Sequence, residues 1–213
     1  MTSLLVVVAL ALAGGADKHG TTGMDKGMGQ IDLDFDKSEV AQVIKGWNEE
    51  SRNVAQTLLD KYGAPDGVTK DMVVWMGDGR WYKTVVTNDP IEHNFPTPHK
   101  NVVTQYIPYR MPVDKIDDVA RFNGAVTYDR VKGVLGVSSN NEATNFLTVN
   151  VVDDIVGGRM DVDAARRFYA DTSNALTSGQ RNEYTDGFRF DVPANAADPD
   201  KAYTEVRPGK VGS

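Results

Sequence analysis

The strongest constraint on the fold of this chain is a pair of short apolar segments separated by a glycine-rich turn. Residues 72–76 (MVVWM) and 81–86 (WYKTVV) flank Gly77, Asp78 and Gly79. β-Branched and aromatic residues favour strands, and a short turn containing Gly and Asp between two such runs is typical of a β-hairpin. We therefore predict an antiparallel sheet that is built around this hairpin.

Helices and further strands are predicted around the hairpin. Residues 36–62 place apolar side chains on one helical face, with a capping-box-like pair, Asp36 and Glu39, at the start. The other predicted elements are an extended segment at 31–35, a Pro-rich loop at 88–100, strands near 102–110 and over 125–138 with a break at Gly133, and helices at 114–122, 141–156 and 161–176. The expected fold class is α+β: a small antiparallel sheet with one long N-terminal helix and a C-terminal helical pair.

Composition excludes several classes of function. The 213 residues carry 30 acidic and 23 basic side chains, for a formal charge of -7, and the basic residues are scattered along the chain. A nucleic-acid-binding protein is expected to show a basic stripe or face, so we expect no nucleic-acid partner. Because the chain has no cysteine, disulfides, thiolate catalysis and Cys-ligated metal sites are excluded.

The N-terminus resembles a secretion signal. Residues 4–12 (LLVVVALAL) are apolar and are followed by small residues, as in the apolar region and cleavage site of a signal peptide. The alternative is a buried N-terminal strand. Gly15 stands where a bacterial lipoprotein signal has its lipidated Cys, so we expect no acyl chain. The chain is thus predicted to be exported, to the periplasm or the medium, with envelope association left open and no transmembrane span in the mature form.

Four regions are predicted along the chain. They are a signal peptide at 1–15, a flexible glycine-rich spacer at 16–30, an α+β domain at 31–178 and a loosely ordered C-terminal tail at 179–213. The tail has few large apolar residues, and the alternative is that it drapes on the domain through Phe188, Phe190 and Tyr203. The sequence does not determine the oligomeric state.

Two histidines form the most suggestive candidate site. His93 and His99 lie six residues apart in HNFPTPH, and neutral imidazoles are common metal ligands. The prolines between them favour polyproline II, which would separate the histidines by ~19 Å. Shared coordination of a divalent metal would need a sharp turn, such as a cis proline allows, and a third ligand such as Asp89, Glu92 or Glu142. The alternative is a rigid connector in which Phe95 packs into the core.

Two further groups are candidate binding residues. Glu142 and Asn145 lie at the start of a predicted buried helix, where such residues often only cap the helix. Asn145 and Asn150 are five residues apart, so we expect at least one of them to face outward or sideways. Tyr106, Tyr109 and Arg110 could form a binding rim or belong to an ordinary edge strand.

Several segments together resemble a known family. They are Trp47 with KYGxPD at 61–66, the Trp75/Trp81 hairpin, HNFPTPH, YRMP and NEATNFLTVNVVDDIVGG with AARRFY. Over residues 45–171 the chain resembles a family of uncharacterised exported bacterial proteins, some of them lipoprotein-like, which has no assigned activity. The resemblance implies export and a shared fold. Family members have a Cys within the segment matched by residues 138–140 and a Glu in place of Val134, so no shared site is implied there.

No catalytic motif is complete in this sequence. It has no G-x-S-x-G motif, no P-loop and no dinucleotide fingerprint. We therefore expect a non-enzymatic binding or structural module of the envelope or the medium, with an envelope or extracellular partner and no cofactor. The alternative is a metal-dependent hydrolase that uses His93 and His99.

Overall fold

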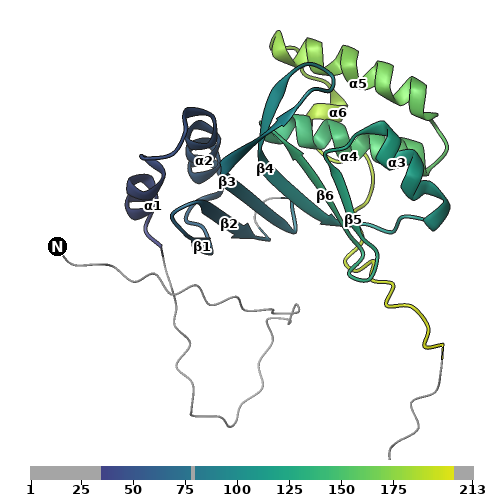
Figure 1. The fold of residues 1–213 in the computed structure, drawn as a ribbon, viewed down its shortest axis with the longest axis horizontal. Helices are drawn as coiled ribbons and strands as arrows, with labels where there is room; N and C mark the ends of the chain where they lie inside the picture. Colours follow the sequence, from purple (N-terminus) through teal and green to yellow (C-terminus); the bar gives the residue numbers. More distant parts are fainter. Residues whose placement is uncertain (1–34, 78–79, 204–213) are drawn as a thin grey trace, which may run out of the picture.

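The computed structural model describes residues 35–77 and 80–203, which form a six-stranded antiparallel sheet and six α-helices (Figure 1). The predicted α+β class is therefore confirmed. The strands are β1 (Gly67–Val68), β2 (Met72–Met76), β3 (Lys83–His93), β4 (His99–Pro108), β5 (Val126–Asp129) and β6 (Val134–Ser139). The helices are α1 (Lys37–Ile44), α2 (Glu49–Tyr62), α3 (Ile116–Phe122), α4 (Glu142–Val156), α5 (Val162–Thr177) and α6 (Glu183–Asp186), with a 3₁₀ turn, η1 (Val113–Lys115), before α3.

The predicted signal peptide, the spacer and nearly all of the extended segment at 31–35 lie outside the described residues. Their assignments stay predictions. Among the described residues, no helix is both long and apolar enough to cross a lipid bilayer.

The hairpin predicted from residues 72–86 is present within the sheet as β2 and β3. Strands β2 and β3 pair antiparallel from Met72 with Thr87 to Met76 with Lys83, and the strand order across the sheet is β1-β2-β3-β4-β6-β5. Trp81 precedes β3 and is fully buried. The sheet thus extends in both directions from the hairpin that the sequence indicates.

The helices lie on one side of the sheet (Figure 1). Side chains alternate between the two faces of a strand, and on the helix-facing side β2, β4 and β6 contribute buried Val73 and Trp75, Val103 and Ile107, and Leu135 and Val137. Helices α1 and α2 cover the β2 end of this face, and α4 covers the β6 end. The core therefore has two adjoining parts, and residues between α2 and α4 lie where they meet.

The prediction of a single long N-terminal helix is wrong, because the structure has two separate helices there, α1 and α2. Gly46 lies in the break, where its lack of a side chain gives a helix little support. Asn48 then caps α2, and its side chain accepts a hydrogen bond from the Ser51 amide. Asn is among the best N-cap residues, so a new helix begins there although the apolar periodicity continues through Trp47.

Part of the predicted C-terminal tail lies on the domain. Phe188 and Phe190 pack against the core, and Phe188 contacts Trp81 edge-on with ring centroids 4.9 Å apart. The Asn150 side chain binds this segment at three backbone groups. Tyr203, in contrast, is fully exposed.

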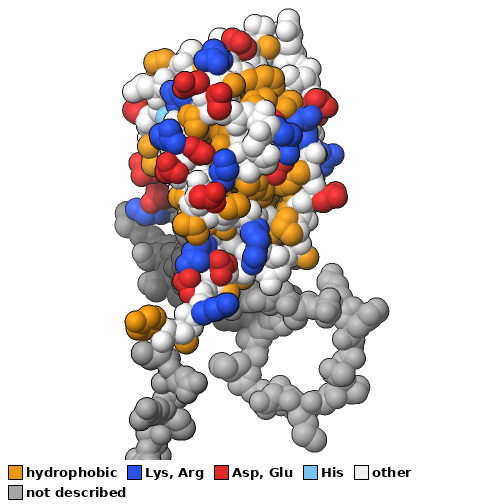
Figure 2. Space-filling model, turned by 90° about the vertical axis from the view of Figure 1, so that its right-hand side faces the viewer, with side chains coloured by type: hydrophobic (Ala, Val, Ile, Leu, Met, Phe, Trp, Pro, Cys, Tyr) orange, Lys and Arg blue, Asp and Glu red, His pale blue; other side chains and the backbone are white. Residues whose placement is uncertain are grey.

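Surface charge is mixed. Figure 2 shows Lys and Arg side chains interspersed with Asp and Glu over the face that it presents. Elsewhere in the described part of the chain, charged side chains also pair locally, as Arg121 does with Asp117 and Asp118. This face therefore offers no single-sign surface to a highly charged partner.

Candidate functional site

The predicted Pro-rich loop is wrong for most of its length. Strand β3 continues to His93 and β4 begins at His99, which leaves only five residues between the strands. Pro90 is accommodated because the β3–β4 register shifts between Val86 and Ile91, and a proline is tolerated at such an irregularity. Cross-strand pairing on both sides of this shift outweighs the preference of isolated prolines for an extended loop.

The short connection brings the two histidines together. His93 and His99 are direct partners in the β3–β4 register, and the Phe95–Pro96 peptide bond between them is cis. Their ring centroids are 4.9 Å apart, and Nδ1 of His93 is 3.4 Å from Nε2 of His99. The separation of ~19 Å expected for polyproline II is wrong, and the sharp turn required for shared coordination is present.

The histidines differ in their surroundings. Nδ1 of His99 lies 2.8 Å from the carbonyl oxygen of Thr97. Burial, and then the neighbouring His99, lower the pKa of His93 below its ordinary value. His93 is therefore biased toward its neutral form at physiological pH.

The acidic candidates do not join the histidines. Glu92 is exposed and precedes His93 by one residue, so its side chain points to the other face of β3. Asp89 is also exposed, and Glu142 binds other groups. Among the described residues, no group of three or more His, Asp or Glu side chains is arranged to hold a metal ion.

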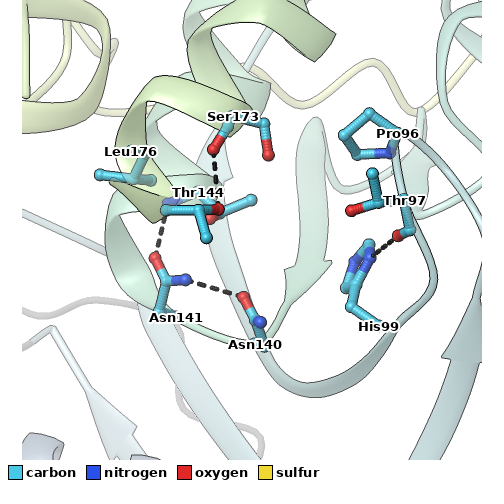
Figure 3. Close-up of a pocket in the computed structure, with 9 residues that line it drawn as sticks. Pro96, Thr97, His99, Asn140, Asn141, Thr144, Ser173 and Leu176 are labelled. Carbon is cyan, nitrogen blue, oxygen red and sulfur yellow. Dashed lines mark hydrogen bonds between the residues drawn. The ribbon is translucent and has the colours of Figure 1, made fainter. Parts of the chain in front are cut away.

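A small hollow borders His99, between the β3–β4 hairpin and helices α4 and α5 (Figure 3). Its volume is about 130 Å³. It is lined by Pro96, Thr97, His99, Asn140, Asn141, Thr144, Ser173, Leu176 and Thr177. Hydroxyl and amide groups predominate, and no Lys, Arg, Asp or Glu contributes to the lining.

The local sequence explains the α4 side of this hollow. Asn141 is the N-cap of α4, and its Oδ1 accepts a hydrogen bond from the Thr144 amide at 2.8 Å. Its Nδ2 donates to Oδ1 of Asn140 at 2.7 Å. The cap thus fixes one wall of the hollow, to which Ser173 on α5 adds, while Pro96, Thr97 and His99 of the hairpin form the facing wall (Figure 3).

Glu142 is the centre of a second polar cluster. Its carboxylate accepts hydrogen bonds from the Lys61 ammonium, the Tyr62 hydroxyl and, at 3.0 Å, Nε1 of Trp81. Burial raises the pKa of the Glu142 carboxyl, but the hydrogen bonds from these three groups outweigh burial and leave the pKa below its ordinary value. Glu142 is therefore an ionised anchor that joins α2, the start of β3 and α4.

The cluster continues into the core through Gln105. The Gln105 amide nitrogen donates to the Tyr62 hydroxyl at 3.1 Å and to Thr84 Oγ1 at 3.2 Å, and its oxygen accepts from Asn145 at 2.9 Å. Oδ1 of Asn145 is buried and has no hydrogen-bond partner among the described residues. These polar side chains occupy the place where the two parts of the core meet.

Neither Asn145 nor Asn150 faces outward, because both are buried. They do point in different directions, since Asn145 binds Gln105 of the sheet and Asn150 binds the C-terminal segment, so the sideways orientation expected for one of them is not contradicted. Helix α4 is covered by the sheet on one side and by α5 and α6 on others. A helix that is enclosed on several sides has no solvent face over much of its length. Polar residues on it are then satisfied internally, Asn145 through Gln105 and Asn150 through the C-terminal segment.

The remaining predicted binding residues do not gather into one rim. Tyr106 lies on the sheet face away from the helices, where Lys83 stands 4.1 Å over its ring. Tyr109 is buried and donates to Asp153 at 2.9 Å, whereas Arg110 is exposed and binds the Ala197 carbonyl. Phe95 packs in the core, stacked on Tyr169 at 5.4 Å. Of the predicted site residues, the structure thus pairs His93 with His99 directly, and it joins Glu142 and Asn145 through the hydrogen bonds of Tyr62 and Gln105.

Sequence reasoning missed four members of the Glu142 cluster. No motif spacing connects them, because Lys61 and Tyr62 end α2, Trp81 precedes β3 and Gln105 lies on β4. Three of them, Lys61, Tyr62 and Trp81, belong to the segments that carry the family resemblance. Their place in these segments was the one feature of the sequence that could have marked them as candidates.

Comparisons with protein-family models, with curated proteins and with solved structures find no match to this chain.

Proposed function

We propose that this protein is an exported, non-enzymatic binding module that holds a neutral, hydrogen-bonding group of an envelope or extracellular partner in the hollow beside His99. The observation that carries the proposal is the lining of that hollow. Three separate segments converge there, and they present hydroxyls, amides and one imidazole without a formally charged side chain.

The lining selects the chemistry of the bound group. A charged group would lose part of its hydration without gaining a counter-charge, and an apolar group would shield amides and hydroxyls from water without offering them a hydrogen bond. A neutral amide or a saccharide hydroxyl avoids both costs. The hollow of about 130 Å³ is smaller than the roughly 300–1,000 Å³ of typical small-molecule sites, so it suits one protruding group of a larger partner.

Export is supported by the sequence. The apolar stretch at 4–12 has the length and flanking small residues of a signal peptide. The family that the chain resembles consists of exported bacterial proteins. An envelope or extracellular location would place the hollow among glycans and secreted proteins, which are rich in neutral hydrogen-bonding groups.

The metal-dependent hydrolase is the alternative proposal. The proximity of His93 and His99 favours it, since a shared metal ion is geometrically possible. It also requires a third protein ligand and a positioned general base, and the described residues bring neither to the two imidazoles. The binding module needs no such addition and is the function that we adopt.

The test is a nuclear magnetic resonance titration of the exported full chain with small probes. Acetamide and N-acetylglucosamine represent the neutral class, and acetate and methylammonium are the charged controls. We expect the neutral probes to shift the amide resonances of Asn140, Asn141 and Thr144, and Ser173→Leu to abolish these shifts by filling the hollow. Ser38→Leu, an exposed serine on α1, is the matched control.

Two results would overturn the proposal. One is equal shifts with neutral and charged probes, and the other is an unchanged response in Ser173→Leu. Either would mean that the hollow does not select a neutral group.

A further inference from the structure

The tip of the β3–β4 hairpin presents two imidazoles as a preformed pair. His93 ends β3 and His99 begins β4, and they face each other in the register. Directly paired residues project to the same side of an antiparallel hairpin, so both rings point toward the side that carries the helices. The rings are inclined by 68°, with His93 Nδ1 and His99 Nε2 separated by 3.4 Å.

This separation matches that of two ligands on one tetrahedral metal ion. Zn–N bonds are about 2.0–2.1 Å, and two such bonds at the tetrahedral angle place their nitrogens about 3.3–3.4 Å apart. The observed 3.4 Å therefore requires no opening or closing of the hairpin. A hydrogen bond between the rings is the competing explanation, and at 3.4 Å it is longer than the usual N–H···N or N–H···O contact.

The hydrogen bond of His99 prepares its ring for a metal. Because a carbonyl oxygen only accepts, the contact of 2.8 Å with Thr97 places the proton of a neutral His99 on Nδ1. Nε2 then carries a free lone pair on the side of His93. Ligating histidines typically donate their second N–H to a backbone carbonyl or carboxylate in this way, which fixes both tautomer and ring orientation (Figure 3).

We propose that His93 and His99 form a two-histidine binding site for a divalent transition-metal ion of the Zn²⁺, Cu²⁺ or Ni²⁺ class. Two imidazoles favour these ions over Mg²⁺ and Ca²⁺, which prefer oxygen ligands. Water or a group of a bound partner completes the coordination.

The site is distinct from the proposed recognition in the hollow, although His99 borders both. Metal binding depends on His93, which does not line the hollow, and hollow binding depends on Ser173, which is not a metal ligand. Failure of one proposal therefore leaves the other standing.

The experiment is isothermal titration of the exported full chain, without a histidine tag, with ZnCl₂ and with MgCl₂. We expect one Zn²⁺ per chain and no saturable binding of Mg²⁺. His93→Gln and His99→Gln should each weaken Zn²⁺ binding by at least about 10–100-fold, the range seen even when an outer-shell partner of a metal ligand is lost. The matched control is His19→Gln, which removes the remaining histidine of the chain and should leave the affinity unchanged.

Circular dichroism of each variant confirms that it is folded, and Co²⁺ in place of Zn²⁺ gives an independent reading from its visible absorption. Loss of both the Zn²⁺ heat and the Co²⁺ absorption in the pair variants supports the site. The proposal is overturned if wild-type protein binds no Zn²⁺ saturably, if the pair variants bind as wild type does, or if His19→Gln alone abolishes binding.

Discussion

Replacing Glu142 by Met tests whether its cluster holds the two parts of the core together. Methionine keeps the length of the side chain but accepts no strong hydrogen bond, so the Tyr62 hydroxyl and Trp81 Nε1 lose their partner. A donor left unsatisfied in a half-buried position costs about 1–3 kcal/mol. The Lys61 side chain is 52% exposed and is rehydrated, so its salt bridge adds little. Folding partly removes water from the Glu142 carboxylate, and methionine avoids that cost, which offsets part of the loss. We therefore expect Glu142→Met to lower the free energy of unfolding by about 2–4 kcal/mol.

Urea unfolding followed by circular dichroism measures this loss. Glu50→Gln is the matched control, because Glu50 forms only an exposed salt bridge with Lys100; we expect it to cost less than about 1 kcal/mol. Glu142→Gln keeps an acceptor for the two donors and should fall between them. The reasoning is refuted if Glu142→Met is no more destabilising than Glu50→Gln, since the cluster would then contribute nothing beyond a surface ion pair.

The remaining predictions concern pH, the C-terminal segment and export. Because the pKa of Glu142 is lowered in the folded state, its stabilisation is present above the unfolded-state pKa and is lost as pH falls through the folded-state pKa. The stability difference between wild type and Glu142→Gln, measured by urea unfolding at several pH values, should therefore vanish in acid; a difference that persists there contradicts the assignment. Gly133→Ala places a Cβ 2.1 Å from the Ala196 carbonyl group at a φ of +63°, so it should cost about 1–3 kcal/mol and expose the C-terminal segment to limited proteolysis. Gly124→Ala, where the added Cβ meets no atom within 4 Å, is its control, and equal protease sensitivity of the two variants would disprove the contact. Val7→Arg places a charge in the predicted signal peptide and should retain the chain in the cytoplasm on cell fractionation; undiminished export would contradict the signal assignment.

Elements that depend on local sequence were predictable. The β2–β3 hairpin follows from its turn residues and alternating apolar side chains, and α4 and α5 begin at the Asn141 and Asp161 caps that their sequences show. The mistaken prediction of one N-terminal helix also had a local cause. The apolar period runs through residues 45–48, whereas the Asn48 cap indicates a second start, and the cap prevailed.

The candidate sites were predictable as residues but not as arrangements. His93, His99, Glu142 and Asn145 were all identified from the sequence. The distance between the histidines was not, because it depends on pairing of β3 with β4 on both sides of a register shift. The partners of Glu142 were missed for a similar reason, since Trp81 is 61 positions away along the chain.

The α+β class, the ends of most helices, the central hairpin and the absence of cysteine chemistry could all be read from the amino-acid sequence. These properties follow from side-chain periodicity, capping and composition, which act over a few residues. The meeting of two imidazoles at a hairpin tip, the neutral hollow beside them and the half-buried carboxylate of Glu142 that joins three parts of the chain could be seen only in the folded molecule. Each of these depends on strand register and on the packing of α4 between the sheet and α5, and such contacts between distant residues are formed by the whole core together.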